Sequence, residues 1–139
     1  MSGEAGGPMR RRQVLLVEDE VAILLYAEML LSDLGFDVAM ATDGARGLEL
    51  VEARAPDLIV TDFMMPRMDG IAMLRRLREA GVKAPAIVVS AIPQSQLPVE
   101  PDEALFDAVL AKPMSEDRLV AVLERLLPAD DAAAVRRRA

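Results

Sequence analysis

Leu58-Ile59-Val60-Thr61-Asp62 leads directly into Phe63-Met64-Met65-Pro66-Arg67-Met68-Asp69-Gly70, and this stretch decides the fold. A run of apolar and β-favouring residues that ends in an acid is typical of a buried parallel strand. The proline and the glycine that follow indicate a loop that takes the chain away from the sheet. The stretch therefore predicts that the carboxylate of Asp62 stands at one edge of a parallel sheet.

The rest of the chain alternates short apolar runs with helical patterns. Besides residues 58–62, we expect strands at 14–17, 36–41, 86–90 and 109–111. Apolar residues at helical spacing predict helices at 21–34, 45–53, 71–80 and 116–127. Strands this apolar have no solvated face, so the alternation predicts an α/β fold, a doubly wound five-stranded parallel sheet with helices on both sides.

Three regions depart from this regular pattern. Pro93, Pro98 and Pro101 fall where the fourth helix belongs, and proline removes a backbone donor and disrupts the preceding turn. We therefore expect an irregular loop there, followed by a short helix at 101–106. We also expect a disordered N-terminal tail at 1–12 and a frayed C-terminal tail at 128–139, which leaves one domain at 13–127.

The composition excludes several classes of function. The chain has 139 residues, a net charge of −7, no cysteine, no histidine and 3% aromatic residues. The net charge repels phosphate backbones and anionic lipids, so we expect neither nucleic-acid binding nor membrane binding. Without a signal sequence or an apolar run of membrane-spanning length, a cytoplasmic protein is the simplest interpretation. Any chemistry must use carboxylates, hydroxyls, lysine and the backbone.

Polar side chains follow four of the five predicted strands. Glu18 and Asp19 come after the first strand, Asp62 ends the third, Ser90 ends the fourth and Lys112 follows the fifth. In open parallel sheets, ligands bind outside the carboxyl ends of the strands, where the strand order reverses. If the order is 2-1-3-4-5, the first and third strands are neighbours, and the three carboxylates meet in one crevice.

Three carboxylates that lie this close together predict a cation site. They repel one another, and a bound divalent cation removes that repulsion. Oxygen ligands without histidine or cysteine favour Mg²⁺ over Zn²⁺. With Lys112 and the Ser90 hydroxyl beside the metal, the site suits a transferring phosphoryl group that Asp62 attacks as nucleophile.

Each of these residues also has a simpler interpretation. An acid after a strand is often only the cap of the next helix, which applies to Asp19 and to Asp62. Ser90 alone could be an ordinary loop hydroxyl, and Lys112 alone a solvated lysine. The joint pattern at four strand ends favours the functional interpretation.

At this point the sequence resembles the receiver domains of bacterial two-component response regulators. The resemblance spans residues 13–127, and its matching pieces are Val14-Leu15-Leu16-Val17-Glu18-Asp19-Glu20, residues 58–70, Ile87-Val88-Val89-Ser90-Ala91 and Leu110-Ala111-Lys112-Pro113. It implies the flavodoxin-like receiver fold with strand order 2-1-3-4-5.

The resemblance also implies roles for the site residues. Asp62 would accept a phosphoryl group from a histidine kinase or a histidine phosphotransfer protein. Ser90 would be the switch hydroxyl, and Lys112, joined to Pro113 by a cis peptide bond, would bind the phosphoryl group. Mg²⁺ would be held by Glu18, Asp19, Asp62 and the Met64 carbonyl.

Two departures from the family pattern concern how phosphorylation is read. Val109 stands three positions before Lys112, where the family usually carries a switching tyrosine or phenylalanine. The proline-rich segment at 92–101 replaces much of the expected fourth helix, whose surface many receivers use to dimerise or to bind targets. Because about a dozen residues follow the last predicted helix, we expect a single-domain regulator, not an enzyme, that binds an unidentified target protein or serves as a phosphate relay or sink.

Two other classes remain as alternatives. A haloacid-dehalogenase-like phosphatase also uses an aspartate nucleophile and Mg²⁺, but it usually carries a second aspartate where this chain has Met64. A receiver-like module that binds partners without phosphorylation would be expected to lack some of the site residues. Ala22, Leu25 and Met29 form a second apolar stripe on the first helix, which either docks the phosphodonor or is marginally buried under a loop.

Overall fold

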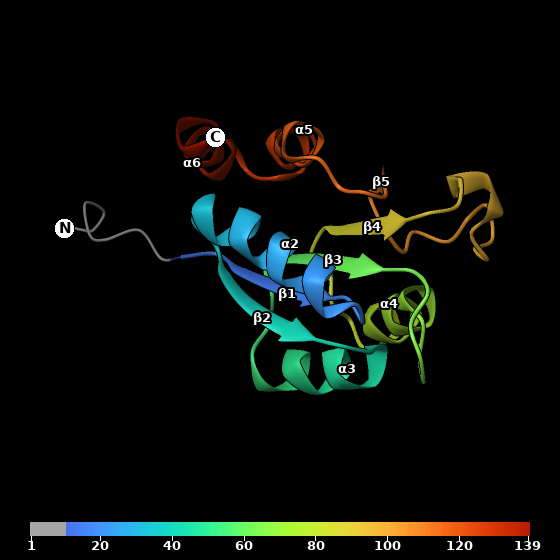
Figure 1. Ribbon diagram of the computed structural model, residues 1–139. Helices are drawn as coiled ribbons and strands as arrows, with labels where there is room; N and C mark the ends of the chain where they lie inside the picture. Colours follow the sequence, from blue (N-terminus) through green and yellow to red (C-terminus); the bar gives the residue numbers. More distant parts are fainter. Residues whose placement is uncertain (1–10) are drawn as a thin grey trace.

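A computed structural model describes residues 11–139, and Figure 1 shows the arrangement of its elements. Five parallel strands form one sheet in the order β2-β1-β3-β4-β5. The strands are β1 (Gln13–Val17), β2 (Asp37–Ala41), β3 (Leu58–Asp62), β4 (Ala86–Ser90) and β5 (Ala108–Ala111). The helices are α2 (Val21–Asp33), α3 (Gly44–Ala53), α4 (Gly70–Glu79), α5 (Glu116–Leu126) and α6 (Ala129–Arg138). The predicted α/β fold and its strand order are confirmed.

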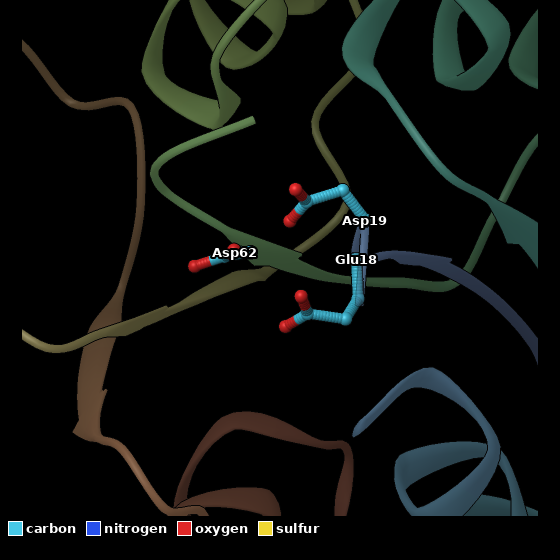
Figure 2. A group of neighbouring side chains, drawn as sticks. All are labelled: Glu18, Asp19 and Asp62. Atoms are coloured by element: carbon cyan, nitrogen blue, oxygen red, sulfur yellow. The ribbon is translucent and has the colours of Figure 1, made fainter. Parts of the chain in front are cut away.

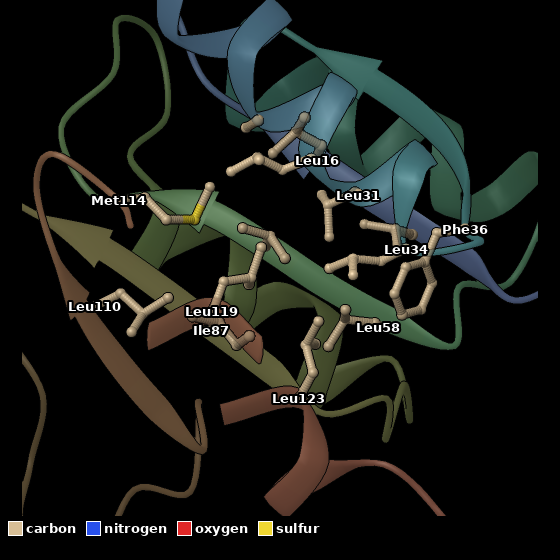
Figure 3. Packing of buried hydrophobic residues seen from close by; sticks show 14 of the residues in the cluster. Leu16, Leu31, Leu34, Phe36, Leu58, Ile87, Leu110, Met114, Leu119 and Leu123 are labelled. Carbon is tan, nitrogen blue, oxygen red and sulfur yellow. The ribbon is translucent and has the colours of Figure 1, made fainter. Parts of the chain in front are cut away.

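Helices cover both faces of the sheet, and two apolar cores result. Side chains alternate along each strand, so Leu16 joins the core under α2 and α5 while Leu15 joins the core over α3 and α4. Figure 3 shows the first of these cores, in which Leu31 of α2 and Leu119 of α5 pack on the strands. Burial on both faces explains why the strands read as continuous apolar runs.

The predicted helix at 101–106 is wrong. The segment between β4 and β5 contains a short 3₁₀ turn, η1 (Gln94–Gln96), and residues 101–106 are irregular. Arg75 of α4 pairs with Glu103 through Nε at 2.9 Å and Nη2 at 3.0 Å, and Arg78 donates to the Leu105 carbonyl at 3.0 and 3.1 Å. Side chains of α4 therefore bind the Glu103 carboxylate and the Leu105 carbonyl, and these contacts hold the segment in an irregular conformation.

The predicted frayed tail at the C-terminus is also wrong, because α6 occupies residues 129–138. Asp130 and Asp131 lie in its first turn and three arginines in its last turn, which complements the helix dipole. Val135 is buried in the same core as α2 and α5. Asp131 pairs with Arg12 at 2.8 Å, so the helix is held by burial and by charge.

The N-terminal tail was predicted as disordered over residues 1–12, of which residues 1–10 lie outside the described part. Arg11 and Arg12 are described and do not fit that prediction. Arg11 pairs with Asp37 at 2.7 Å and donates to the Phe36 carbonyl at 3.0 Å, which holds the chain beside β2 before β1 begins. Over residues 11–139, none of the helices has the length and apolar character that a membrane crossing requires.

Candidate functional site

The three predicted acids meet at the carboxyl ends of two neighbouring strands. β1 pairs directly with β3, so Glu18 and Asp19, which follow β1, lie beside Asp62 at the end of β3. One carboxylate oxygen from each of the three lies within 4.8 Å of the others. Figure 2 shows the three side chains directed into the same space. Glu18 and Asp62 are 3% and 5% exposed, whereas Asp19 is exposed, so the cluster opens to solvent on one side.

Lys112 lies between two of these acids. Its Nζ is 3.1 Å from Glu18 Oε1 and 3.1 Å from Asp62 Oδ2. Lys112 follows β5, two strands away from Asp62, and the peptide bond to Pro113 is cis, as the family resemblance implied. The lysine is the cation of the site and partly offsets the charge of the acids.

The site is electrostatically costly. Burial raises the pKa of Asp62, and it does the same to Glu18, where the charge of Asp62 adds to the effect. Attraction to Lys112 opposes both shifts but does not cancel them. Burial alone would lower the pKa of Lys112, yet its bonds to Asp62 and Glu18 raise it. The acids therefore carry more negative charge than the lysine neutralises.

The donor set fits a hard divalent cation. Three carboxylates supply oxygen ligands only, and a cluster partly open to water leaves room for the water molecules that Mg²⁺ retains. Met64, the predicted source of a carbonyl ligand, lies two residues after Asp62 in the loop between β3 and α4, with its side chain exposed. These residues are the ones that could hold Mg²⁺.

Ser90 ends β4, the strand next to β3, and its hydroxyl is already bonded. Its Oγ accepts from the backbone N–H of Ile92 and donates to the Ile92 carbonyl, both at 3.0 Å. The side chain is 2% exposed. Ser90 therefore lies at the predicted edge of the sheet but bonds to its own loop. Val109, in β5, packs partly buried against the core on the α3 and α4 face.

The loop after Asp62 lies close to the end of β3. The Gly70 N–H donates to the Phe63 carbonyl at 2.8 Å, and a Cβ on Gly70 would lie 2.1 Å from the Asp62 carbonyl oxygen. Thr61 Oγ1 donates to the same carbonyl at 2.8 Å. Only glycine permits this close approach. Gly70 therefore brings the chain back to the end of β3, eight residues after Asp62.

The sequence did not indicate the partner of this loop. Arg67 forms an ion pair with Asp43, the residue that caps α3, and the Gly44 N–H donates to the Met68 carbonyl at 3.1 Å. In the sequence, Asp43 and Gly44 stand directly before the helix expected at 45–53, which suits a turn with a capping residue. The further signal in the sequence was the positive charge of Arg67 in a mostly apolar loop that also contains Asp69, and this signal indicated no partner.

A mostly apolar cavity of about 460 Å³ opens beside the acids. It lies between α2 and the turn after β5, with Tyr26, Pro113 and Met114 among its lining residues. The second apolar stripe of α2 continues from it over the surface, since Leu25 is 53% exposed and Met29 48%. The stripe is therefore not buried under a loop within the described residues.

Comparison with known proteins places these features in one family. The family model of the response regulator receiver domain matches residues 14–124. The transcriptional regulatory protein DltR of Streptococcus agalactiae is 37% identical over 109 residues, which cover 78% of this chain and 49% of DltR. The chain thus spans about half the length of the curated relatives it matches.

Solved structures of receiver domains have the same fold as this chain. The signal receiver domain of an HD domain-containing protein from Pseudomonas fluorescens Pf-5 has a TM-score of 0.77 and 28% identity, over 84% of this chain and 94% of that one. The receiver domain of the sensor histidine kinase PA1611 from Pseudomonas aeruginosa PAO1 has a TM-score of 0.70 and 29% identity, over 84% and 98%. That structure has a magnesium ion coordinated in its active-site cleft.

Proposed function

The chain belongs to the response regulator receiver domains, the phosphoacceptors of two-component signalling, and we propose that Asp62 is its phosphoacceptor in a Mg²⁺-dependent reaction. The observation that carries the proposal is the meeting of Glu18, Asp19 and Asp62 around one space, with Lys112 3.1 Å from the Asp62 carboxylate. The donor would be a histidine kinase or a histidine phosphotransfer protein.

The proposed metal ligands are carboxylate oxygens and one backbone carbonyl. They belong to Glu18, Asp19, Asp62 and Met64. When bound, Mg²⁺ supplies positive charge to the oxygens of the phosphoryl group. The magnesium ion in the PA1611 receiver domain supports this part of the proposal.

The transfer itself exchanges one bond of phosphorus for another. A carboxylate oxygen of Asp62 attacks the phosphorus of the phosphohistidine, and a phosphorus–oxygen bond forms as the phosphorus–nitrogen bond breaks. The electron pair stays with the imidazole nitrogen of the donor. Lys112 stabilises the charge on the phosphoryl oxygens. The Ser90 hydroxyl, which donates to the Ile92 carbonyl in this structure, turns to donate to one of those oxygens. Burial of Asp62 keeps its carboxylate weakly solvated and therefore reactive.

The proposed partners are proteins. The exposed apolar side chains of Leu25 and Met29, beside the site, offer a contact surface for the helices of the phosphodonor. The output is contact with a downstream protein that the chain does not identify. The absence of nucleic-acid and membrane binding stays a prediction that rests on the net charge of −7.

The donor surface is tested by changing Leu25 and Met29 to glutamine. Transfer from the cognate phosphodonor should slow, while phosphorylation by acetyl phosphate stays as in the wild type, since a small donor needs no docking surface. Equal loss of both reactions would reject the surface.

The phosphoacceptor is tested by intact-mass analysis after incubation with acetyl phosphate. We expect one phosphoryl adduct that requires Mg²⁺ and is absent from Asp62→Asn. Asp102→Asn is the matched control, because Asp102 is an exposed aspartate in the turn before β5. An adduct that survives Asp62→Asn would overturn the assignment, and turnover of a phosphomonoester would favour a phosphatase.

A further inference from the structure

Arg67 has an unusual backbone conformation. Its φ is +68°, and it is the one non-glycine residue within 11–139 with a positive φ. Side chains with a Cβ are disfavoured in this region, and such residues cluster where the surrounding structure requires them. Arg67 lies in the loop between Asp62 and α4, five residues after Asp62. The Met68 N–H donates to the Pro66 carbonyl at 2.7 Å, so a tight backbone turn of the γ type closes around Arg67.

The side chain of Arg67 joins this turn to the start of α3 through an ion pair with Asp43. Arg67 Nη2 contacts Asp43 Oδ2, while Asp43 Oδ1 accepts from the Arg46 N–H at 2.9 Å as the cap of α3. Asp43 is 5% exposed and is fixed as the cap of α3, whereas the Arg67 side chain that contacts it is 68% exposed. The Arg46 N–H and the Arg67 guanidinium lower the pKa of Asp43, so the carboxyl stays ionised near neutral pH.

A second contact joins the same two segments. The Gly44 N–H donates to the Met68 carbonyl at 3.1 Å, and a Cβ on Gly44 would lie 2.7 Å from that oxygen. The Gly70 N–H donates to the Phe63 carbonyl, which closes the loop on its first residue, directly after β3. Residues 63–69 are therefore held at one end by β3 and at the other by the start of α3. Met64 lies between these two attachments.

We propose that Arg67 is a positioning residue of the metal site, whose ion pair with Asp43 fixes the loop that carries Met64, the proposed carbonyl ligand. The inference rests on the proposed Mg²⁺ site and adds a residue that does not touch the metal. Groups that orient metal ligands typically change metal affinity by about 10–100-fold when they are removed. Arg67 acts through the backbone, so we expect an effect at or below the lower end of that range.

The direction of the effect separates positioning from simple electrostatics. Removing a positive charge near a cation site should strengthen Mg²⁺ binding if charge alone matters. If Arg67 positions a ligand, its removal should weaken Mg²⁺ binding despite the lost repulsion. Glycine accepts a positive φ without strain, so Arg67→Gly removes the ion pair and relieves the backbone. The variant should therefore remain folded.

The experiment measures the Mg²⁺ dissociation constant of the full chain by isothermal titration calorimetry. We expect Arg67→Gly and Asp43→Asn each to weaken Mg²⁺ binding by about three- to tenfold. Asparagine still caps α3, so Asp43→Asn removes the charge and keeps the cap. Arg67→Lys should recover part of the affinity, and the double variant should be no weaker than either single one. Arg46→Gln, which removes a nearby arginine that pairs with Glu49, should not weaken binding.

Phosphorylation by acetyl phosphate gives an independent measure. The Mg²⁺ concentration for half-maximal labelling should rise in Arg67→Gly, while the labelling rate at saturating Mg²⁺ stays within about twofold of the wild type. Unchanged or tighter Mg²⁺ binding in Arg67→Gly would overturn the positioning role alone. A wild-type chain that neither binds Mg²⁺ nor is labelled would overturn the proposed function and this inference with it.

Discussion

Asp62→Asn should make the protein more stable when divalent cations are absent. Asp62 is 5% exposed, and burial raises its pKa, so its negative charge opposes folding at neutral pH. Asparagine has nearly the same size, and it removes the charge without opening a cavity. The phosphoacceptor would thus be a residue whose chemistry lowers the stability of the fold.

The distances in the site give the size of the effect. At an effective dielectric constant of about 20, the pair of Asp62 with Lys112 at 3.1 Å contributes about 5 kcal/mol of attraction. At the 4.8 Å limit, repulsion from the buried Glu18 contributes about 3.5 kcal/mol, and repulsion from the exposed Asp19 contributes less. Because water screens the exposed Asp19, repulsion and attraction nearly offset one another, and the burial of Asp62 decides the sign. We expect Asp62→Asn to gain about 2 kcal/mol, which is the usual size for relieving a buried and incompletely paired charge.

Thermal unfolding followed by circular dichroism measures the effect. A change of about 2 kcal/mol in a domain of this size raises the Tm by roughly 6–8 °C. The comparison is made in EDTA and in excess Mg²⁺, with Asp102→Asn as a control that should stay within about 0.5 kcal/mol of the wild type. Mg²⁺ should raise the Tm of the wild type more than that of Asp62→Asn, because the variant lacks one ligand.

A lower Tm of Asp62→Asn in EDTA would refute this reasoning. It would mean that Asp62 acts mainly as the partner of Lys112, and that the acids do not repel one another strongly enough to require a cation.

Three further predictions concern other parts of the chain. Lys112→Met should bind Mg²⁺ more tightly, because a competing cation is gone, yet be labelled by acetyl phosphate about 100-fold more slowly, as calorimetry and intact-mass kinetics would show. The pair with Arg75 lowers the pKa of Glu103 to about 2, from 4.5. The ion pair should therefore stabilise the fold fully above pH 4.5, and this stabilisation should be lost as the pH falls through about 2. Melting curves recorded at several pH values should show this loss in the wild type and not in Glu103→Gln. Val135→Ala should lower the free energy of unfolding by about 2 kcal/mol in urea titrations, since Val135 is buried, and no change would mean that α6 does not dock.

The strands and the acid cluster could be predicted because both depend on local sequence. Each strand is a short apolar run. Parallel strands have their carboxyl ends at the same edge of the sheet, whatever their positions in the sequence. The meeting of Glu18 with Asp62 also required the strand order 2-1-3-4-5, which the family resemblance implied, and Lys112 lies at the same edge.

The wrong predictions concern segments whose structure depends on distant residues. A helix of ten residues such as α6 is marginal by itself, and it forms here because Val135 packs on the core and Asp131 pairs with Arg12, 119 positions away in sequence. The segment at 101–106 was expected to form a short helix, but Arg75 of α4 binds the Glu103 carboxylate and Arg78 binds the Leu105 carbonyl. The pair of Arg67 with Asp43 was likewise hidden by 24 residues of separation.

The bonds of Ser90 have a consequence for signalling. A hydroxyl has one hydrogen, and that of Ser90 is given to the Ile92 carbonyl at 3.0 Å. If Ser90 donates to a phosphoryl oxygen, as proposed, Ile92 must lose this bond, since one proton cannot serve both acceptors. Each phosphorylation then releases one defined contact at the start of segment 91–107. Competition for a single hydrogen can thus couple the modification to the segment without an aromatic ring at position 109, where the chain has Val109.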